Sequence, residues 1–495
     1  MKFLGIDIGT SGSRAVVIDE NGKIIASATA LHEDFASPEI GWAEQDPEDW
    51  WRACKETIAE ILQSVNAEEI MAVSFSGQMH GSVFLDGSDN VIRPALLWCD
   101  QRTERQCSRI NEMIGRERLI ELVCNPSITG FTLPKLVWLR EKEPHNWGKV
   151  AGVLLPKDYI RLKISGDKAS DVSDSSGTLM FDVQNRKWSG DVLSAFQIDE
   201  CILPKVYESI EVTGSVSVSG ANETGLKIGT LIVAGAGDNA AGAIGMGITR
   251  PGTVSVTIGT SGVVFAVTKI PRIDLKGRIH TLCHAIPGRW HNTGVTQGAG
   301  LSLKWFRDNF ANGSTYDELG REAANVPSGS DGAIWLPYLM GERTPHMDAN
   351  ARAAFVGLTA GHTRGHLTRA VMEGVAFSLR DSIEIFRQLG ADVDSIRLGG
   401  GGAKSPVWRQ IQADVYGHPV EILEADEGAA FGAAVLAGVG AGAWTTVDEA
   451  CERTIRVAAT VVPNAASVET LDRNYQAYRS LYSALHGATD IISDR

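Results

Sequence analysis

The sequence predicts an α/β protein with two similar halves. Short apolar runs that have the character of strands alternate with segments in which apolar residues recur at helical spacing. The motif Ile-Gly-Thr-Ser-Gly occurs at 8–12 and again at 258–262, each time between two apolar runs. With 495 residues, the chain is also too long for a single hydrophobic core. We therefore expect each half to contain a strand hairpin closed by a glycine-hydroxyl turn.

The first half shows its elements most clearly near its start. Apolar runs are separated by the first motif and by a tight turn at 21–23, which predicts consecutive strands. The predicted strands are 2–7, 13–19, 24–30 and 70–81, the last of which runs out into a polar loop. Between the third and fourth strands, residues 46–65 predict a helix, with Asp46 as its N-cap and Pro47 in its first turn.

The second half repeats this scheme. Residues 231–245 predict a buried strand, a sharp loop and a helix of small residues, and residues 253–267 predict the second hairpin. Residues 396–417 predict a strand, a glycine loop and a helix, with Ser405 as N-cap and Pro406 at the first helical position. The side chains of this helix that we expect in the core are Trp408, Ile411 and Val415.

Composition and charge exclude several functional classes. Apolar residues make up 43% and charged residues 21% of the chain, as in ordinary globular enzymes. The formal charge of −14, with no basic block, argues against binding to nucleic acid or to a membrane surface. No apolar run approaches the ~20 residues needed to span a bilayer. The seven cysteines are scattered without a CxxC pair, and no signal-peptide pattern follows Met1, so we expect a cytoplasmic protein with reduced thiols.

The repeated turn has the chemistry of a phosphate site. Gly-Thr-Ser-Gly presents backbone N–H groups without side-chain bulk, together with two hydroxyl donors. Asp7 lies directly before the first turn, where it would either hold Mg²⁺ beside phosphates or only cap the hairpin. Asp238 follows a buried strand among glycine and alanine. It is either a general base that accepts a hydroxyl proton or the N-cap of the next helix, and the motif leaves both interpretations open.

Two polar segments offer contacts for a small ligand. The residues concerned are Gln78, Met79 and His80 in one segment and Trp98, Asp100 and Arg102 in the other. A lone histidine is more often structural, and the Asp–Arg pair is either part of a polyol site beside an apolar wall or an ordinary surface ion pair. The glycine loop at 399–405 allows backbone to approach a flat ligand closely. The small-residue helix at 426–438 allows the same, unless it serves tight helix packing.

Two long segments resemble the signatures of the FGGY family of carbohydrate kinases, in the actin/hexokinase/Hsp70 superfamily. Residues 130–142 (GFTLPKLVWLREK) fit the first signature, with Lys135 in place, and residues 353–374 (AAFVGLTAGHTRGHLTRAVMEG) fit the second. The resemblance runs nearly the whole chain. Residues 154–178 and 336–346 are most similar to those family members that phosphorylate D-xylulose.

This resemblance implies ATP-dependent phosphorylation of D-xylulose to D-xylulose 5-phosphate, by two ribonuclease H-like domains around a central ATP cleft. Domain 1–244 would bind the sugar, and domain 245–495 mainly the nucleotide. Asp238 would be the catalytic base, and Asp7 and Asp238 would hold Mg²⁺. The implied sugar contacts are Gln78, Met79, His80, Trp98, Asp100, Arg102, Asp238 and Asn239. The implied ATP contacts are Gly9, Thr10, Ser11, Gly259, Thr260, Gly400, Gly401, Ala403 and Lys404.

Two other classes of function stay open at this point. A kinase of the same family for another ketopentose or a polyol, such as ribulose, would differ only in its sugar pocket. The superfamily also includes chaperones, filament proteins and sugar-responsive regulators, which hydrolyse nucleotide without a small acceptor, but these do not explain the two signatures. Sugar and ATP are the expected partners, and a homodimer is open because relatives in the family are commonly dimers.

Overall fold

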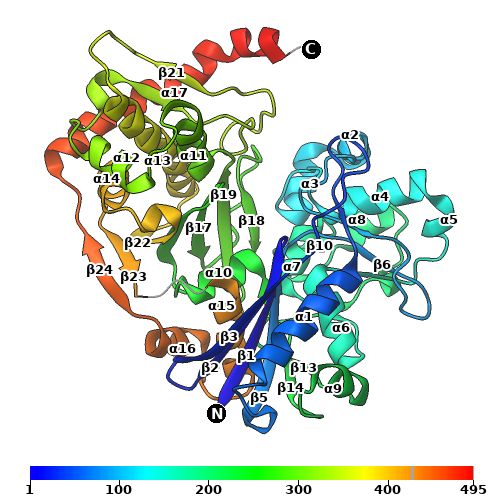
Figure 1. Cartoon of the computed structure of the whole chain (residues 1–495). Helices are drawn as coiled ribbons and strands as arrows, with labels where there is room; N and C mark the ends of the chain where they lie inside the picture. The colour runs from blue at the N-terminus through cyan, green and yellow to red at the C-terminus, as the bar shows by residue number, and fades with distance from the viewer. Residues whose placement is uncertain (425–427, 494–495) are drawn as a thin grey trace.

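The computed structural model describes residues 1–424 and 428–493. Figure 1 shows two lobes, one formed mainly by the blue, cyan and first green part of the chain and the other mainly by the later green to red part. Each lobe is built on a seven-stranded sheet. The lobes meet near the bottom of the view and stand apart above it.

The first sheet contains the first predicted hairpin at its centre. The strand order is β13-β14-β5-β1-β2-β3, and β15 also pairs with β5. The bounds are β1 Lys2–Ile8, β2 Gly12–Asp19, β3 Ile24–Leu31, β5 Ile70–Gly77, β13 Val212–Ser215, β14 Leu231–Val233 and β15 Ala236–Gly237. Strand β1 runs antiparallel to β2 and parallel to β5. All four strands predicted near the start of the chain are confirmed.

The second sheet has the second hairpin at its centre. Its strand order is β18-β19-β17-β16-β22-β23-β24. The bounds are β16 Gly252–Ile258, β17 Gly262–Thr268, β18 His280–Cys283, β19 Trp290–Thr296, β22 Val393–Gly400, β23 Val420–Leu423 and β24 Val457–Val461. Strand β16 runs antiparallel to β17 and parallel to β22, as β1 does to β2 and β5.

The register of the two sheets is also equivalent. Ile8, the last residue of β1, lies opposite Gly77 of β5, and Ile258, the last residue of β16, lies opposite Gly400 of β22. In both sheets the Gly-Thr-Ser-Gly turn therefore leaves the sheet beside the end of a parallel neighbour. The predicted α/β class with two similar halves is confirmed.

Helices cover both sheets, and short strand pairs lie in the connections. The helices are α1 Pro47–Ile61, α2 Glu104–Ile114, α3 Arg116–Val123, α4 Thr132–Lys142, α5 Pro144–Trp147, α6 Pro156–Ser165, α7 Val172–Ser175, α8 Gly190–Ala195, α9 Val218–Thr224, α10 Asp238–Gly245, α11 Ala299–Phe310, α12 Tyr316–Ala324, α13 Arg364–Gln388, α14 Pro406–Tyr416, α15 Gly428–Gly440, α16 Val447–Thr454 and α17 Ala465–Ser493. The short strands are β4 Glu44–Gln45, β6 Val83–Leu85, β7 Ala95–Leu96, β8 Gly152–Leu154, β9 Ala169–Asp171, β10 Phe181–Asp182, β11 Lys187–Trp188, β12 Lys205–Tyr207, β20 Ile334–Leu336 and β21 Ala354–Val356.

Two predicted helix starts are confirmed by their caps. Asp46 accepts a hydrogen bond from the backbone at the start of α1, and Ser405 does the same for α14. Helix α1 ends at Ile61 and not at residue 65 as predicted. The hydroxyl of Ser64 donates to the Ile61 carbonyl, which competes with continuation of the helix.

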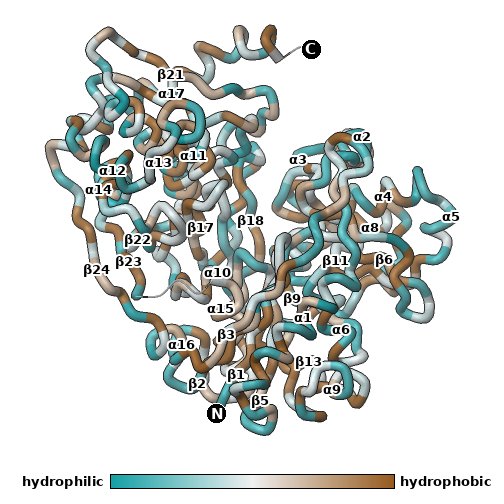
Figure 2. Tube along the Cα trace, in the orientation of Figure 1, coloured by the Kyte–Doolittle hydropathy of each residue, from teal (hydrophilic) through white to brown (hydrophobic). Residues whose placement is uncertain are grey.

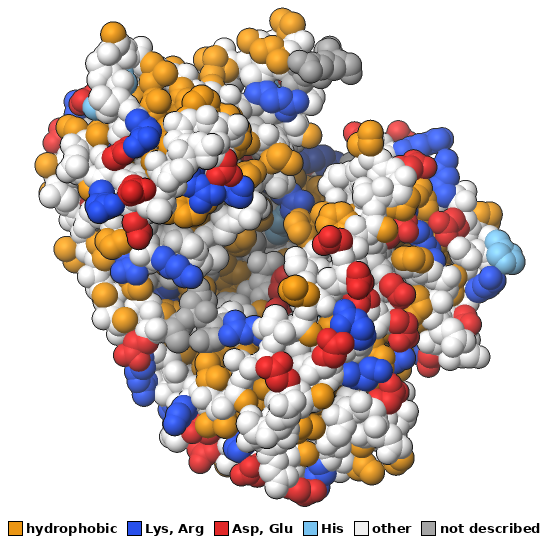
Figure 3. Space-filling model, in the orientation of Figure 1, with side chains coloured by type: hydrophobic (Ala, Val, Ile, Leu, Met, Phe, Trp, Pro, Cys, Tyr) orange, Lys and Arg blue, Asp and Glu red, His pale blue; other side chains and the backbone are white. Residues whose placement is uncertain are grey.

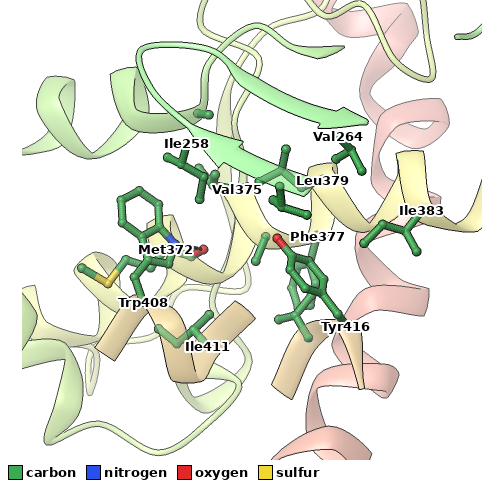
Figure 4. Packing of buried hydrophobic residues seen from close by; sticks show 14 of the residues in the cluster. Ile258, Val264, Met372, Val375, Phe377, Leu379, Ile383, Trp408, Ile411 and Tyr416 are labelled. Atoms are coloured by element: carbon green, nitrogen blue, oxygen red, sulfur yellow. Dashed lines mark hydrogen bonds between the residues drawn. The ribbon is translucent and has the colours of Figure 1, made fainter. Parts of the chain in front are cut away.

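The core of the second lobe forms around α13. Figure 4 shows α13 between the second hairpin on one side and α14 on the other. Trp408 and Ile411 of α14 are buried against this helix, and Val415 is fully buried, as predicted. Each such side chain contributes about 1.5–3 kcal/mol by leaving water. Apolar segments accordingly concentrate inside both lobes in Figure 2.

Helices α15 and α16 belong to the second half of the chain but pack on the first sheet. Phe3 and Val16 of that sheet share one apolar cluster with Phe431 and Val435 of α15 and with Trp444. The division of the chain at residues 244 and 245 stays a prediction. In the described part of the chain no helix is long and apolar enough to cross a membrane. The seven cysteines are unpaired.

Candidate active site

Two carboxyl groups meet where three parallel strands of the first sheet end. Gly77 of β5 lies in register with Ile8 of β1 on one side and with Gly237 of β15 on the other. Asp7 is near the end of β1, and Asp238 follows β15 directly as the first residue of α10. Ligands of α/β sheets bind outside these carboxyl ends. Two carboxylates that are 231 residues apart in sequence are therefore brought to one edge.

Asp238 has a high proton affinity for an aspartate. Gly237 occupies the N-cap position of α10, so the alternative interpretation of Asp238 as the N-cap is wrong. Burial and, after it, the carboxylate of Asp7 raise the pKa of Asp238 to about 7. The side-chain amide of Asn239 donates to Oδ1 of Asp238 at 3.1 Å. A carboxylate that titrates near neutral pH has the basicity that a general base needs.

Asp7 carries an oxygen without a hydrogen-bond partner. Its Oδ1 is buried and unpaired among the described residues, and burial raises the pKa of Asp7. The hairpin turn itself is closed by the N–H of Gly9, which donates to the Gly12 carbonyl at 3.0 Å. Within residues 1–424 and 428–493, no group of three or more His, Cys, Asp or Glu side chains could enclose a metal ion. The unpaired oxygen of Asp7 beside Asp238 does fit Mg²⁺, which commonly uses one or two carboxylates together with substrate phosphates.

A cavity with an empty volume of about 930 Å³, part of it open to solvent, lies beside Asp238. Five of the predicted sugar contacts line it, namely Met79, His80, Trp98, Asp238 and Asn239. The other lining residues are Ile128, Gly130, Ser261, Val263, His280, Leu282, Thr293, Val295, Gln297 and Arg343. Both lobes thus supply walls, and the space-filling view in Figure 3 is hollowed between them.

His80 is held at the cavity wall through both its ring and its backbone. Its Nδ1 donates to the Gly177 carbonyl at 2.7 Å, which leaves Nε2 as an acceptor. The carbonyl of His80 accepts hydrogen bonds from Lys135 Nζ at 2.8 Å and Thr132 Oγ1 at 3.1 Å. Burial lowers the pKa of His80 to about 3, so the ring is neutral. The signature residue Lys135 and the loop at Gly177 therefore position this histidine.

A series of hydrogen bonds between side chains connects the cavity to the first turn. Trp98, which is 37% exposed, donates from Nε1 to Thr10 Oγ1 at 3.0 Å. The Thr10 hydroxyl donates to Gln78 Oε1 at 3.3 Å, and Gln78 Nε2 donates to the Gly9 carbonyl at 3.4 Å. Gln78 is buried and does not line the cavity. Its position supports the turn.

The carbonyl groups of the first turn accept hydrogen bonds from other parts of the protein. The Thr10 carbonyl accepts from Gln45 Nε2 at 2.9 Å, and the Ser11 carbonyl accepts from the His32 N–H at 3.0 Å. No atom of the described residues accepts a hydrogen bond from the N–H groups of Thr10 and Ser11. Unpaired amides on a bulk-free turn are the arrangement that binds a phosphate oxygen.

The second turn has the same polarity. The Gly259 and Thr260 carbonyls accept from the N–H groups of Gly300 and Leu301, at 2.8 and 3.1 Å, and so cap the start of α11. A Cβ at position 300 would lie 2.3 Å from the Gly259 carbonyl oxygen, so glycine is required for this contact. Across the part of the chain that the structure describes, the N–H groups of Thr260 and Ser261 again have no acceptor. Two turns with unpaired amides, the arrangement suited to an anion, therefore lie in one molecule.

The glycine loop after β22 begins beside the second turn. Gly400 has φ +70°, and a Cβ there would lie 2.6 Å from the Ile258 carbonyl oxygen. Gly401 and Lys404 are exposed, whereas Ala403 is buried. The predicted nucleotide contacts of the second half are thus neighbours, and their contact with adenosine stays a prediction.

Asp100 and Arg102 lie behind the cavity and do not line it. Their side chains are 0% and 1% exposed, so they are not the surface ion pair considered above. The Arg102 guanidinium lies 3.6 Å from the ring centre of Trp42 and 2.6 Å from Glu44. The buried ion pair of Asp100 and Arg102 stabilises the loop that carries Trp98. Asp100 and Arg102 are therefore not among the predicted sugar contacts that the structure gathers at the cavity.

Sequence reasoning missed the wall that the second lobe contributes. The missed residues include His280, Leu282, Thr293, Val295, Gln297 and Arg343. Most lie on β18 and β19, where an ordinary strand pattern contains no ligand signal. Arg343 lies in the segment 336–346, which was used only for its resemblance to the family and from which no site residue was predicted.

Comparison with known proteins identifies the family to which the chain belongs. Models of the N-terminal and C-terminal domains of the FGGY family of carbohydrate kinases match residues 2–245 and 254–441. The chain is 40% identical over 486 residues to a xylulose kinase of Bacillus subtilis, covering 98% of this chain and 97% of the relative.

Two solved structures have the same architecture. A xylulose kinase from Rhodospirillum rubrum has 29% identity and a TM-score of 0.93 and covers 99% of this chain and 100% of its own. A gluconate kinase from Lactobacillus acidophilus has 26% identity and a TM-score of 0.95, with 99% of both chains covered. The fold and the family expected from the two signatures are therefore confirmed: the chain belongs to the FGGY family of carbohydrate kinases, enzymes that transfer a phosphoryl group from ATP to a sugar.

Proposed function

We propose that this kinase phosphorylates the terminal hydroxyl of D-xylulose to give D-xylulose 5-phosphate. The observation that carries the proposal is Asp238, a carboxyl group with a pKa near 7 on the wall of a cavity that two anion-binding turns flank. Similarity to xylulose kinases over nearly the full chain supports the choice of sugar. A kinase for another ketopentose or a related polyol is the alternative.

In the proposed reaction, Asp238 accepts the proton of the C5 hydroxyl as that oxygen bonds to the γ-phosphorus of ATP. The bond from phosphorus to the β,γ-bridging oxygen breaks in line, and ADP leaves. The amides of the two turns orient the phosphates, and Asn239 keeps Asp238 directed at the hydroxyl. Positioning supplies most of the acceleration, because phosphoryl transfer involves little covalent chemistry by the protein.

Asp7 and Asp238 are the residues that would hold Mg²⁺ in this scheme. Bound there with the phosphates, the ion would neutralise negative charge on the transferred group. The sugar would lie between Met79, His80 and Trp98 on one wall and the residues of the second lobe on the other. The nucleotide would extend from the turns toward Gly400, and the domain division at 244 and 245 belongs to the same proposal.

The proposal is tested with a coupled assay of ADP release from Mg·ATP. D-xylulose is compared at matched concentration with D-ribulose, L-ribulose, glycerol and gluconate, with a control that lacks sugar. We expect strong turnover on D-xylulose over a low blank. Strong turnover on another sugar would overturn the choice of substrate and keep the mechanism. ATP hydrolysis that is indifferent to every sugar would overturn the role of Asp238 as the base for a sugar hydroxyl.

A further inference from the structure

Arg343 enters the cavity from a backbone that is fixed to the second sheet. The N–H of Thr344 donates to the Val295 carbonyl at 3.0 Å, and the N–H of Val295 donates to Thr344 Oγ1 at 3.1 Å. Thr344 Oγ1 in turn donates to the Arg278 carbonyl at 2.8 Å. These bonds attach Thr344, the residue after Arg343, to Val295 of β19 and to the segment just before β18. A side chain that leaves from such a point has little freedom in where it can reach.

The guanidinium of Arg343 has no protein partner. No carboxylate of the described residues lies within 4.0 Å of it, and none of their atoms accepts a hydrogen bond from it. The neighbouring Glu342 is used elsewhere, since its Oε1 accepts from the N–H groups of Gln297 and Arg343 at 2.9 and 2.8 Å. Its Oε2 accepts from Ser378 Oγ at 3.3 Å. Arg343 is half-buried at the cavity wall and its guanidinium donors are unpaired, so they are available to a ligand.

Arg343 lies at the end of the cavity that is lined by His80 and His280. Burial lowers the pKa of His80 to about 3; the hydrogen bond to Gly177 opposes this shift, and Lys135, His280 and Arg343 add to it. Burial and then Arg343 lower the pKa of His280 to about 3. The pKa of Asp238 responds to burial and to Asp7. The geometry agrees: Thr344 bonds to Val295 of β19, two residues from Thr293, which lies opposite His280 of β18. The ring of Phe131 contacts both histidines, with ring centres 4.7 Å from His80 and 5.5 Å from His280.

The two histidines and the arginine offer opposite hydrogen-bonding roles. His280 Nδ1 bonds to Asn125 Oδ1 at 3.2 Å, so its Nε2, like that of His80, is an acceptor for a hydroxyl. Arg343 is a donor only and needs an acceptor. In a sugar, hydroxyl groups can serve either role, but a carbonyl oxygen accepts only. A ketone end therefore matches this end of the cavity better than a fully reduced polyol end.

We propose that Arg343 determines substrate specificity by donating hydrogen bonds to the C2 carbonyl oxygen and the C1 hydroxyl of a ketopentose whose C5 hydroxyl lies at Asp238. This inference rests on the proposed function. It assigns the recognition of the ketone to the second lobe and the acceptance of the proton to the first. Reduction of the carbonyl to a hydroxyl adds a proton that a donor-only guanidinium cannot accept, so a polyol must find another acceptor for this proton or bind with one hydroxyl unpaired.

The test compares D-xylulose with xylitol and D-arabinitol, the polyols obtained by reducing its C2 carbonyl. Dissociation constants are measured by calorimetry for the intact enzyme, Arg343→Met and Arg343→Lys. We expect the intact enzyme to prefer D-xylulose by at least about tenfold. Arg343→Met should weaken D-xylulose binding by about 10–100-fold and polyol binding by less than about threefold. Arg343→Lys should fall between, because lysine keeps the charge and loses the planar fork.

Arg352→Met is the matched control, since Arg352 lies in the same segment and bonds to the carbonyls of Ala349 and Ala351 outside the cavity. Far-UV circular dichroism, Tm and ATP affinity check that each variant is folded. An unchanged preference in Arg343→Met, or equal binding of ketose and polyol by the intact enzyme, overturns the inference. A loss of kcat with unchanged sugar affinity also overturns it, because Arg343 would then act on the phosphoryl group. If the intact enzyme phosphorylates no D-xylulose, the proposed function itself has failed.

Discussion

The environment of Asp238 determines how the reaction should depend on pH. A carboxyl group must be ionised to accept a proton, and burial together with Asp7 places the pKa of Asp238 at about 7. In the proposed reaction, the form of Asp238 that can act as the base is therefore lost as the pH falls through this value. The acid limb of the pH profile therefore reports two features of the structure, the burial of Asp238 and the nearby carboxylate of Asp7.

We expect kcat/KM for the sugar to fall about tenfold per pH unit below about pH 7 and to level off above it. Asp7→Asn should move this limb to lower pH, because it removes the neighbouring negative charge, even though it lowers the plateau. Asp238→Ala should reduce turnover by about 10²–10⁴ with ATP binding intact. The measurement is initial rate against pH at subsaturating sugar. A profile that stays level across the acid range would contradict the assignment of Asp238.

Four residues of the candidate site could be predicted from the sequence because each lies at or shortly after the end of a buried strand. These are Asp7, Met79, His80 and Asp238. His280 could not be found in this way, because it lies within a strand and reaches the cavity only through the pairing of β18 with β19. The role of Gln78 was also hidden, since its partner Gly9 is 69 residues away.

At the scale of elements, helix α15 contacts both elements that carry the two carboxyl groups, β1 with Asp7 and α10 with Asp238. A Cβ at Gly5 of β1 would lie 2.0 Å from the Ala430 carbonyl oxygen of α15, and one at Gly432 would lie 1.8 Å from the Ala241 carbonyl oxygen of α10. Helix α15 thus touches, backbone to backbone, both the strand that carries Asp7 and the helix that begins at Asp238. Of the two interpretations of the small-residue segment 426–438, its described residues support tight packing; residues 426 and 427 lie outside the described residues.

Gly432→Ala should therefore act on both stability and catalysis. The added methyl group forces α10 and α15 apart, and we expect the free energy of unfolding to fall by about 1–3 kcal/mol. We also expect kcat to fall, because Asp238 moves with the start of α10. Gly242→Ala is the matched control: Gly242 lies in α10, the helix that α15 contacts, and a Cβ there meets no atom within 4 Å.

Denaturant unfolding and steady-state kinetics compare the two variants. Gly242→Ala should be neutral or more stable by up to about 1 kcal/mol, with unchanged kcat, because alanine favours a helix over glycine. If Gly432→Ala were as stable and as active as the control, the backbone contact between α10 and α15 would not position the site.

At the scale of the whole molecule, the repeat predicted the architecture but not the crossing of the chain between lobes. Two equal motifs in equal contexts implied two equivalent hairpins, and the registers Ile8–Gly77 and Ile258–Gly400 bear this out. The packing of α15 on β1 joins segments more than 400 residues apart, which local patterns cannot report. That crossing holds the lobes together at their lower end in Figure 1, and the hollow between the lobes in Figure 3 lies above it.

This arrangement predicts that the sugar itself draws the lobes together. One wall of the cavity carries His80, Trp98 and Asp238, and the other carries Gln297 and Arg343, so a bound ketose would bridge both lobes. Closure would also exclude water from Asp238 and the γ-phosphate, which keeps ATP from being hydrolysed. We expect the radius of gyration from small-angle X-ray scattering to decrease when D-xylulose and a non-hydrolysable ATP analogue are added.

The nucleotide analogue alone should produce a smaller decrease, because the turns bind phosphate without filling the sugar pocket. Arg343→Met, measured with the sugar at saturation, should close less than the intact enzyme, since one side of the bridge is gone, whereas Arg352→Met should close fully. Equal compaction with and without sugar would show that closure is driven by the nucleotide. The low rate of ATP hydrolysis that we expect without sugar would then need an explanation other than an open cleft.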